Sequence, residues 1–316
     1  MSDRRTRLAP SPTGALHLGN ARTFLINWAM ARQQNWTIVL RVEDLDGPRV
    51  KEGADKLAID ILQWLGLDWD EGPHYQRHDL TRYHAALDRL AGQGLIYPCQ
   101  CTRGDIAAAA RSAPHEGDEH ELRYPGTCRP AAATPTRFEP ALDATAWRVR
   151  VPDQVISFTD QVAGEQAINV AQGVGDFVLS TRMGLPAYQL AVVVDDAAQH
   201  ITDVVRGDDL VPSAARQIML QQMLNIAPQP RYTHLPLVYG PDGRRLAKRH
   251  GDTRLTTYRK HGVSAERIIG LLGHWSGLGP RQPMTLSMFL ERFDLARLPR
   301  QPITFTADDE KWLLTK

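Results

Sequence analysis

The N-terminal part of the chain alternates between short apolar segments and amphipathic segments, and this order restricts the fold more than any other feature. Residues 6–10 predict a short strand that runs into a loop at 11–14, where Pro and Gly interrupt regular pairing. Apolar side chains recur at helical spacing over 20–33, whereas residues 37–42 are β-branched and apolar, like a buried strand. A second helix is expected from about 52 to 65. This order predicts an α/β fold with a doubly wound parallel sheet, whose ligands bind at the carboxyl ends of the strands.

Residues 98–146 interrupt this pattern, because they are rich in Ala, Pro, Thr and charged residues and contain all the cysteines. The α/β pattern resumes at Tyr188–Val194 and continues at His200–Val205, and a helix is expected at about 213–224. The residues beyond Gly251 are mostly helical in pattern. We therefore expect a first half of the core, an insertion, a second half of the core and a small helical appendage, at 1–97, 98–146, 147–250 and 251–316.

The charge balance excludes a general electrostatic attraction to nucleic acid. Lys and Arg number 37 against 36 Asp and Glu, so the formal net charge is +1 and any RNA contact must use a local basic face. The longest candidate for a membrane segment, Leu190–Val194, is far too short, and no apolar segment follows the basic residues 1–7. We expect a cytoplasmic protein without a membrane partner.

The segment that joins the first strand to the first helix has the features of a phosphate site. Unpaired backbone N–H groups and the positive end of the helix dipole lie at such a helix N-terminus. Gly19 allows close approach of a nucleotide, and His17 can donate to a phosphate oxygen. The alternative is that His17 and Asn20 cap the helix and bind no ligand.

Five short motifs in a fixed order resemble the class I aminoacyl-tRNA synthetases, in the form found in glutamyl-tRNA synthetases. The resemblance covers roughly residues 6 to 275 and implies a Rossmann-like class I synthetase core. The motifs are Arg7–Gly14 with His17–Asn20, Arg41–Asp46, Tyr188–Asp196, Arg206–Asp209 and Arg245–Arg249.

The resemblance implies an ATP site with Mg²⁺ as the accompanying ion. Lys248 occupies the lysine position of the second ATP motif, although Arg245 stands where a lysine is usual and Ala247 where a serine is usual. The alternative for this motif is a solvated basic turn. The implied catalytic residues are Lys248, His17 and Asn20, and the implied ATP-binding residues are His17, Gly19, Asn20 and Lys248.

The same resemblance implies a pocket for L-glutamate. Arg7 and Arg206 would hold the side-chain carboxylate, since a guanidinium grips a carboxylate through two parallel hydrogen bonds. Tyr188 would supply a hydroxyl, while Glu43 and Ser11 would receive the ammonium group. A glutamine-specific relative would leave the buried cation of Arg206 unpaired, at a cost of several kcal/mol.

Two structural alternatives stand beside this pocket. Arg206 could form an ion pair with Asp208 or Asp209, and Glu43 could pair with Arg41 at the end of its strand.

Cys99, Cys101 and Cys128 form the second group of chemically active residues. An odd cysteine count argues against a disulfide framework and for a metal or free thiols. Three thiolates with one further oxygen or nitrogen make a closed tetrahedral structural zinc site, for which His115 or His120 could supply the fourth ligand. The arrangement resembles the zinc site of the glutamyl-Q tRNA(Asp) synthetases, which implies Tyr124 as the fourth ligand; three free thiols are the alternative.

The segment after Arg249 is expected to be too short for an anticodon-binding domain. Shortened glutamyl cores with a cysteine–tyrosine zinc site resemble the glutamyl-Q tRNA(Asp) synthetases. This resemblance implies a ligase that activates glutamate with ATP and transfers it to queuosine in the anticodon of tRNA-Asp, and we expect it to act as a monomer. The alternatives are a glutamyl-tRNA synthetase fragment charging tRNA-Glu, another nucleotidyltransferase and a non-catalytic RNA-binding paralogue.

Overall fold

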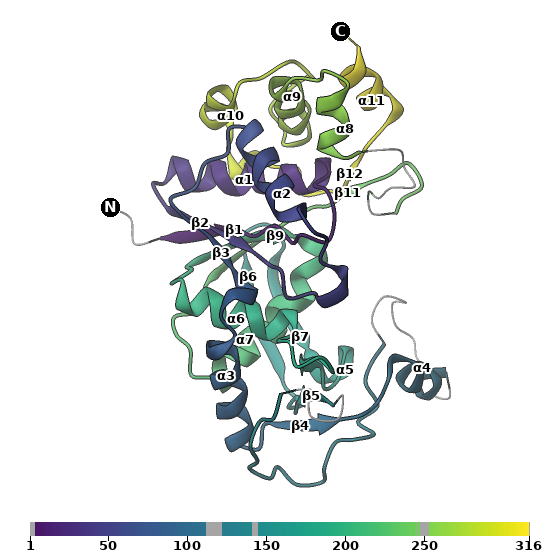
Figure 1. Cartoon of the computed structure of the whole chain (residues 1–316). Coiled ribbons are helices and arrows are strands. Elements are labelled where there is room, and N and C mark those ends of the chain that lie inside the picture. Colours follow the sequence, from purple (N-terminus) through teal and green to yellow (C-terminus); the bar gives the residue numbers. More distant parts are fainter. Residues whose placement is uncertain (1–3, 112–121, 141–144, 245, 247–252, 316) are drawn as a thin grey trace.

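The computed structural model describes residues 4–111, 122–140, 145–244, 246 and 253–315. Its centre is a set of parallel strands (Figure 1). One sheet has the order β1-β2-β3 and the other the order β7-β6-β10-β9, with every pair parallel except β6 with β7. The bounds are Arg5–Leu8 for β1, Thr37–Val42 for β2, Glu71–Tyr75 for β3, Val155–Asp160 for β6, Gly164–Asn169 for β7, Asp203–Gly207 for β9 and Arg231–Leu235 for β10.

The two sheets meet where the chain enters β1 and β9. The backbone N–H of Thr202 donates to the carbonyl oxygen of Arg5 at 2.9 Å, and the backbone N–H of Arg5 donates to Oγ1 of Thr202 at 2.8 Å. The α/β core that the sequence predicts is therefore present, and β1 and β9 run side by side within it (Figure 1).

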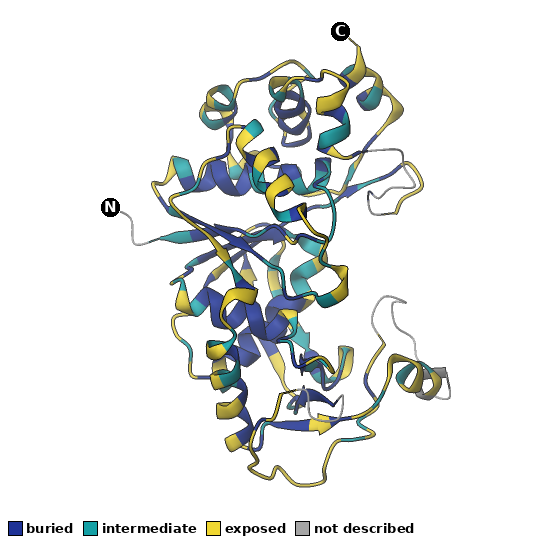
Figure 2. Ribbon diagram, in the orientation of Figure 1, coloured by how far each residue is buried: buried dark blue, intermediate teal, exposed yellow. Residues whose placement is uncertain are grey.

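Helices cover both faces of this core, as a doubly wound sheet requires. Leu40 of β2 packs in one buried cluster with α1 and the C-terminal helices, whereas its neighbour Val39 packs in a second cluster with α3, α6 and α7. Figure 2 shows the resulting buried layers on either side of the strands. The bounds are Leu18–Gln33 for α1, Ala54–Trp64 for α2, Thr81–Gly92 for α3, Tyr188–Ala198 for α6 and Val211–Met223 for α7.

The segment Tyr188–Val194, which resumes the α/β pattern in the sequence, is the first part of helix α6. All residues from Gln189 to Asp196 are buried, so the apolar run has no exposed face to give it an amphipathic period. Its C-terminal part brings Asp195 and Asp196 into the interior, where buried arginines pair with them.

A smaller antiparallel sheet carries the cysteine-containing segment. Its order is β4-β5-β8, and the predicted insertion boundaries at 98 and 146 fall within β4 and at the start of β5. The segment is thus joined to the core through paired strands. The bounds are Ile96–Cys99 for β4, Ala146–Val149 for β5, Val178–Ser180 for β8, Arg103–Arg111 for α4 and Val170–Gly173 for α5.

The C-terminal helices pack directly on α1. Nε2 of Gln33 donates to the carbonyl oxygens of Leu290 and Phe293, and Trp275 and Phe289 belong to the same buried cluster as α1. This region comprises α8 (Leu255–Lys260), α9 (Ala265–Trp275), α10 (Leu286–Arg292), α11 (Ala307–Leu314) and the short parallel pair β11 (Val238–Tyr239) and β12 (Ile303–Thr304).

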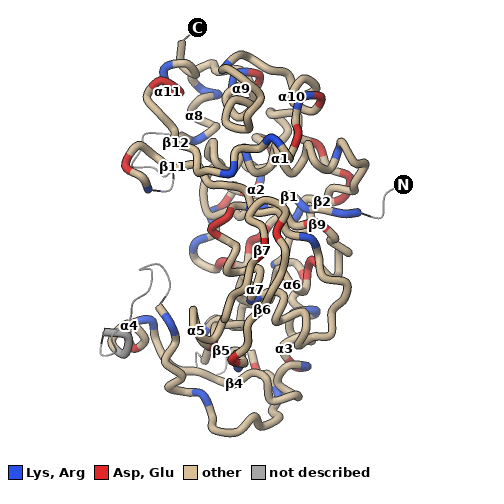
Figure 3. Tube along the Cα trace, turned by 180° about the vertical axis from the view of Figure 1, so that it is seen from behind, with Lys and Arg blue, Asp and Glu red and all other residues tan. Residues whose placement is uncertain are grey.

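Short 3-10 helices are found at Gly47–Arg49 (η1), Gln76–His78 (η2), Asp208–Leu210 (η4) and Leu295–Arg297 (η6). Among the described helices, none has both the length and the apolar character needed to cross a membrane. Basic and acidic residues are both scattered over the trace, as Figure 3 shows, in agreement with the net charge of +1.

We expect Gly270→Ala to destabilise the packing of α9. A Cβ atom at this position would overlap the carbonyl oxygen of Gln282, and backbone cannot yield as a flexible side chain can. Overpacking of this kind costs about 1–3 kcal/mol, which thermal unfolding followed by circular dichroism would detect as a lower Tm. Gly92→Ala is the matched control, because a Cβ there meets no atom within 4 Å and should leave Tm unchanged or slightly raised. Equal melting of both variants would contradict this account.

Candidate functional site

A cavity of about 380 Å³ opens where β1, β2 and β9 end. Its volume is within the range of small-molecule sites in proteins. Four of the five predicted glutamate-binding residues line it, and so do the three residues of the predicted phosphate site. These seven residues are Arg7, Glu43, Tyr188, Arg206, His17, Gly19 and Asn20. The carboxyl ends of parallel strands therefore bring together motifs that lie far apart in the chain.

His17 caps helix α1. Its Nδ1 accepts from the backbone N–H of Gly19 at 3.2 Å and of Asn20 at 3.4 Å, while Oδ1 of Asn20 accepts from the backbone N–H of His17 at 3.2 Å. A helix cap formed by His17 and Asn20 was the alternative to a phosphate site that the sequence allowed, and this cap is present. Because Nδ1 accepts, the ring proton of neutral His17 lies on Nε2, which makes that nitrogen a donor on a cavity-lining ring.

Two glycines in the cavity wall lie close to neighbouring side chains, which would have to shift to admit a Cβ atom. A Cβ at Gly19 would lie 3.1 Å from Cε1 of His17, and a Cβ at Gly207 would lie 2.7 Å from Oδ1 of Asp209. A larger residue at Gly19 would displace the capping imidazole, so the shape of the helix N-terminus depends on this glycine.

A buried ion cluster supports one side of the cavity. Nη1 of Arg41 donates to Oδ1 of Asp196 at 2.7 Å, and Nε of Arg7 lies 3.5 Å from the same oxygen. Nη2 of Arg41 lies 3.3 Å from Oε1 of Glu43, so the strand-end pair considered as an alternative is present. Glu43 nevertheless lines the cavity, so it both pairs with Arg41 and faces the space where a ligand could bind.

The pKa values reflect this crowding of charge. Burial lowers the pKa of the Arg7 guanidinium, with Arg41 and Arg206 adding to the effect and Asp196 opposing it. Burial likewise raises the pKa of Glu43, although Arg41 and Arg7 counteract the shift. The two guanidinium groups that line the cavity, Arg7 and Arg206, thus lie beside the carboxylates of Glu43 and Asp209, so the lining offers both signs of charge.

Arg206 is held by neutral groups. Its Nε donates to Nε2 of His234 at 3.0 Å, its Nη1 to Oε1 of Gln217 at 2.9 Å, and its Nη2 to the carbonyl oxygen of Leu210 at 3.3 Å. These contacts differ from the ion pair with Asp208 or Asp209 that the sequence also allowed. They fix the direction of the guanidinium, and no carboxylate of the described residues bonds to it.

Ser11, the fifth predicted residue, lines a second and larger cavity of about 740 Å³. Glu43 and Tyr188 line both cavities, so the two spaces adjoin along these side chains. The larger one lies between the core and the cysteine-containing segment. Four arginines line it, namely Arg49, Arg103, Arg148 and Arg182.

The three cysteine sulfurs come together in the fold. Their Sγ atoms all lie within 4.8 Å of one another, and those of Cys101 and Cys128 are 3.5 Å apart. A tetrahedral zinc site with Zn–S bonds of about 2.3 Å would place its sulfurs about 3.8 Å apart, so the group can hold a metal ion of this kind. The hydroxyl of Tyr124 lies 3.4 Å from Sγ of Cys99 and 3.7 Å from Sγ of Cys101, in position for a fourth ligand.

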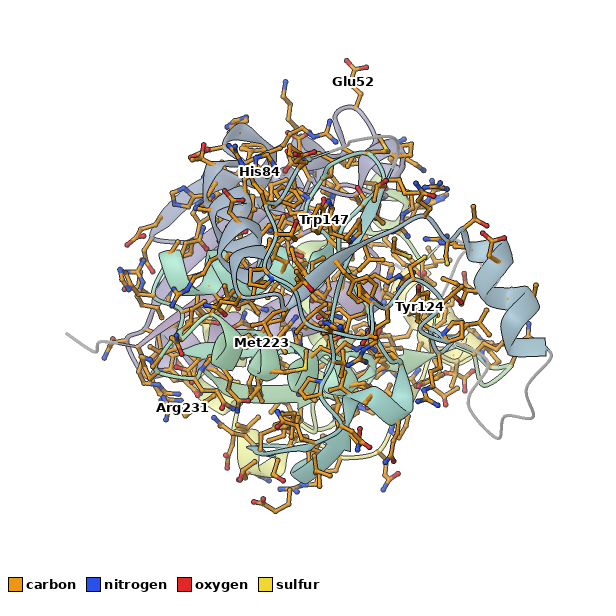
Figure 4. The ribbon with its side chains drawn as sticks, turned by 90° about the horizontal axis from the view of Figure 1, so that it is seen from below. Glu52, His84, Tyr124, Trp147, Met223 and Arg231 are labelled. Carbon is orange, nitrogen blue, oxygen red and sulfur yellow. The ribbon has the colours of Figure 1, made fainter. Side chains whose placement is uncertain are left out.

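Arg148 lies against this group. Its Nε donates to Sγ of Cys99 at 3.3 Å, and its guanidinium stacks 3.9 Å from the centroid of the Tyr124 ring. A buried cation at this position offsets the charge of thiolates. Figure 4 labels Tyr124, which lies toward the side of the molecule that carries α4.

Some predicted residues lie outside the described part of the chain. These are Lys248 with its neighbours Arg245 and Ala247, and the candidate ligands His115 and His120. Asp196 lies in one of the quoted motifs but was assigned no role from the sequence, and Gln217 and His234 lie in none of the motifs. Each is separated by many residues from the group that it orients, and only the strand and helix packing brings them together.

The fold is that of a class I synthetase catalytic domain. The family model described as "tRNA synthetases class I (E and Q), catalytic domain" matches residues 4–311, and the chain belongs to this family. Within it the chain belongs with the glutamyl-Q tRNA(Asp) synthetases. Proteins of that name from Rhodopirellula baltica and Symbiobacterium thermophilum are each 45% identical to it, over 96% of this chain and 96% of their own length.

Glutamate–tRNA ligases are similar at a lower level. The protein of that name from Pelobacter propionicus is 37% identical over 99% of this chain, which spans 66% of the length of the relative. A solved structure of a glutamate tRNA ligase from Elizabethkingia meningosepticum, in complex with its amino acid, superposes with a TM-score of 0.80 at 25% identity. That match covers 99% of this chain and 69% of the ligase chain.

We expect the purified protein to bind about one divalent metal ion per chain at the cysteine group. Tyr124→Phe should weaken metal binding, because it removes the only hydroxyl that the structure describes beside two of the sulfurs. Metal content by mass spectrometry and competition with a chromogenic chelator would measure the loss. Tyr97→Phe is the matched control, since its hydroxyl donates to Asp176 and contacts no cysteine in the described structure. Equal metal affinity of the Tyr124→Phe variant and the wild type would exclude Tyr124 as a ligand.

Proposed function

We propose that this chain activates L-glutamate with ATP to form glutamyl-adenylate and transfers the glutamyl group to queuosine in tRNA-Asp. The observation that carries the proposal is the cavity in which Arg7, Arg206 and Glu43 face the capped N-terminus of α1. The similarity to proteins named glutamyl-Q tRNA(Asp) synthetase supports the choice of acceptor.

The proposed first step needs positioning and charge stabilisation. An oxygen of the α-carboxylate of glutamate attacks the α-phosphorus of ATP, and pyrophosphate leaves. No general base is required because the carboxylate is already ionised. His17, Gly19 and Asn20 would hold the phosphates, with Mg²⁺ bound to ATP.

Lys248 would stabilise the charge that develops on the transferring phosphates. The described residues on either side of its segment support this role. The backbone N–H of Leu246 donates to the carbonyl oxygen of Val238 at 3.0 Å, and the carbonyl oxygen of Thr253 accepts from Leu18 at the start of α1 at 3.2 Å.

Glutamate would be recognised by charge at both of its ends. Arg7 and Arg206 would take the side-chain carboxylate, Tyr188 would add a hydroxyl, and Glu43 with Ser11 would receive the ammonium group. The neutral partners of Arg206 support this assignment, because a glutamine amide would leave the buried guanidinium uncompensated.

The larger cavity would admit the acceptor nucleoside. It adjoins the glutamate pocket at Glu43 and Tyr188, so an acceptor hydroxyl there could approach the activated carboxyl group. The arginines that line it would offset RNA phosphates, and Figure 3 shows basic segments of the trace beside α4. Charging of tRNA-Glu is the second candidate, and the similarity to glutamate–tRNA ligases favours it.

We further propose that the metal is a structural Zn²⁺ held by Cys99, Cys101, Cys128 and Tyr124. Cys101 also lines the larger cavity, so the ion would fix one wall of the acceptor site. A closed set of four protein ligands leaves no position for a substrate.

We expect glutamate-dependent exchange of pyrophosphate into ATP in the absence of any tRNA. Arg206→Ala should raise the KM for glutamate by about 100-fold or more, because a buried charge pair is lost, while the KM for ATP changes little. Arg231→Ala is the control, since this exposed arginine pairs with Asp203 on the strand that carries Arg206. An unchanged glutamate KM in Arg206→Ala would remove that arginine from the pocket.

Two substitutions of His17 separate its cap from its proposed contact with ATP. His17→Asn keeps a good capping side chain, so the free energy of unfolding should stay near that of the wild type. His17→Ala should lose about 0.5–2 kcal/mol of stability. Both should slow pyrophosphate exchange, because both remove the ring donor. Normal exchange by a stable His17→Asn protein would restrict this residue to its structural role.

The acceptor is tested with labelled glutamate and purified tRNAs. We expect glutamylation of tRNA-Asp that carries queuosine and none of tRNA-Asp that carries unmodified guanosine at the same position. Stable attachment to tRNA-Glu with none to tRNA-Asp would favour the second candidate.

A further inference from the structure

Behind Arg206 lies a buried side chain that the proposed reaction does not use. His234 is paired with Arg206 in the register of β10 and β9, and only 1% of its surface is exposed. It does not line either cavity described above. Its ring stands between the guanidinium of Arg206 on one side and the carboxylate of Asp160 on the other.

The contacts of the ring determine its tautomer. An arginine can only donate, so Nε2 of His234, 3.0 Å from Nε of Arg206, must be the acceptor. The ring proton is therefore on Nδ1, which faces Oδ2 of Asp160 at 2.6 Å. Asp160 also accepts from the backbone N–H of His234 and from the backbone N–H groups of Val162 and Ala163. The donors that surround the Asp160 carboxylate are therefore His234 and backbone N–H groups, and Arg206 is not among them in the described structure.

The opposite side of the guanidinium is oriented in the same way. Oε1 of Gln217 accepts from Nη1 of Arg206, and Nε2 of Gln217 donates to Oε1 of Gln189 at 3.0 Å. Nε2 of Gln189 in turn donates to Oγ of Ser213 at 2.9 Å. The amides of Gln217 and Gln189 thus form one chain of hydrogen bonds with consistent directions. The three acceptors of Arg206, on His234, Gln217 and Leu210, are all uncharged groups.

We propose that His234 is the positioning residue that aims the guanidinium of Arg206 at the ligand carboxylate, and that protonation of His234 weakens glutamate binding. The inference rests on the proposed function. A carboxylate at this position would orient Arg206 equally well, but it would also neutralise the charge that the ligand needs. A neutral imidazole satisfies Nε of Arg206 and leaves the positive charge for the ligand.

Protonation would reverse the polarity of Nε2. The groups that face the ring are Asp160, Arg206, the stacked ring of Tyr232 and the backbone carbonyl of Leu210. A protonated Nε2 would donate toward that carbonyl, which also accepts from Nη2 of Arg206, and two cations would then compete at one acceptor.

The direction of the pH effect follows from the surroundings of the ring. Burial lowers the pKa of His234 and Arg206 adds to the shift, whereas Asp160 opposes it. The ring is therefore neutral at neutral pH and becomes charged only below its ordinary range. We expect the KM for glutamate to be constant near neutrality and to rise as the pH falls through the lowered pKa of His234.

The test compares three proteins in pyrophosphate exchange, with glutamate binding also measured by calorimetry. His234→Leu removes the acceptor, which should raise the glutamate KM about 10- to 100-fold at all pH values and leave the ATP KM unchanged. His234→Gln offers an amide oxygen that does not titrate. It should keep a glutamate KM closer to that of the wild type, without the additional rise at acid pH.

Two outcomes separate this inference from the proposed function. If the wild type catalyses no glutamate-dependent exchange, the proposed function fails. If it does so and His234→Leu has the wild-type glutamate KM, or His234→Gln has the wild-type acid rise, the positioning role is wrong. Nitrogen NMR of ¹⁵N-histidine-labelled wild type needs no variant to fold, and a proton on Nε2 of neutral His234 would also overturn the inference.

Discussion

The site depends on two buried guanidinium groups, those of Arg7 and Arg206, that lie near each other and are not both paired with carboxylates of the described residues. Arg7 is partly offset by Asp196, which Arg41 holds more closely at 2.7 Å, and Arg206 is surrounded by a carbonyl, an amide and an imidazole. The desolvation of these groups opposes folding, so a strongly packed core on both faces of the sheet must stabilise the arrangement. In the proposed function, the guanidinium groups of Arg7 and Arg206 are the groups that take the carboxylate of the ligand.

Two cavities adjoin along the same pair of side chains, and the proposed function assigns a different chemical step to each of them. Tyr188 and Glu43 stand between the smaller space, which suits an amino acid beside a nucleotide, and the larger arginine-lined space next to the cysteine group. An activated carboxyl group at their junction would be within reach of an acceptor from the other side. The cysteine group is joined to the larger space because Cys101 lies in the cavity wall and because Arg148 contacts Cys99 and also lines that cavity.

At the helix N-terminus, the structural role of His17 as a cap is compatible with its proposed contact with ATP. Nδ1 of His17 caps α1, and this fixes the ring so that Nε2 is the donor atom. The two interpretations of His17 therefore concern different nitrogens of one ring: Nδ1 forms the cap, and Nε2 is the proposed phosphate donor. In the same way Glu43 pairs with Arg41 and also lines the cavity.

The sequence by itself determined the α/β core, because strand and helix periods are local properties, while the phosphate loop and the acidic ligand site were predicted through the resemblance of short motifs to a known family. It also identified Arg7, Glu43, Tyr188 and Arg206, which the fold brings to one cavity, whereas it did not foresee that Ser11 would line the neighbouring one. Only the tertiary structure decided what holds these groups in place. Asp196, Gln217 and His234 come from α6, α7 and β10, and whether Arg206 meets a carboxylate or a neutral acceptor depends on strand register and helix packing, which no local pattern encodes.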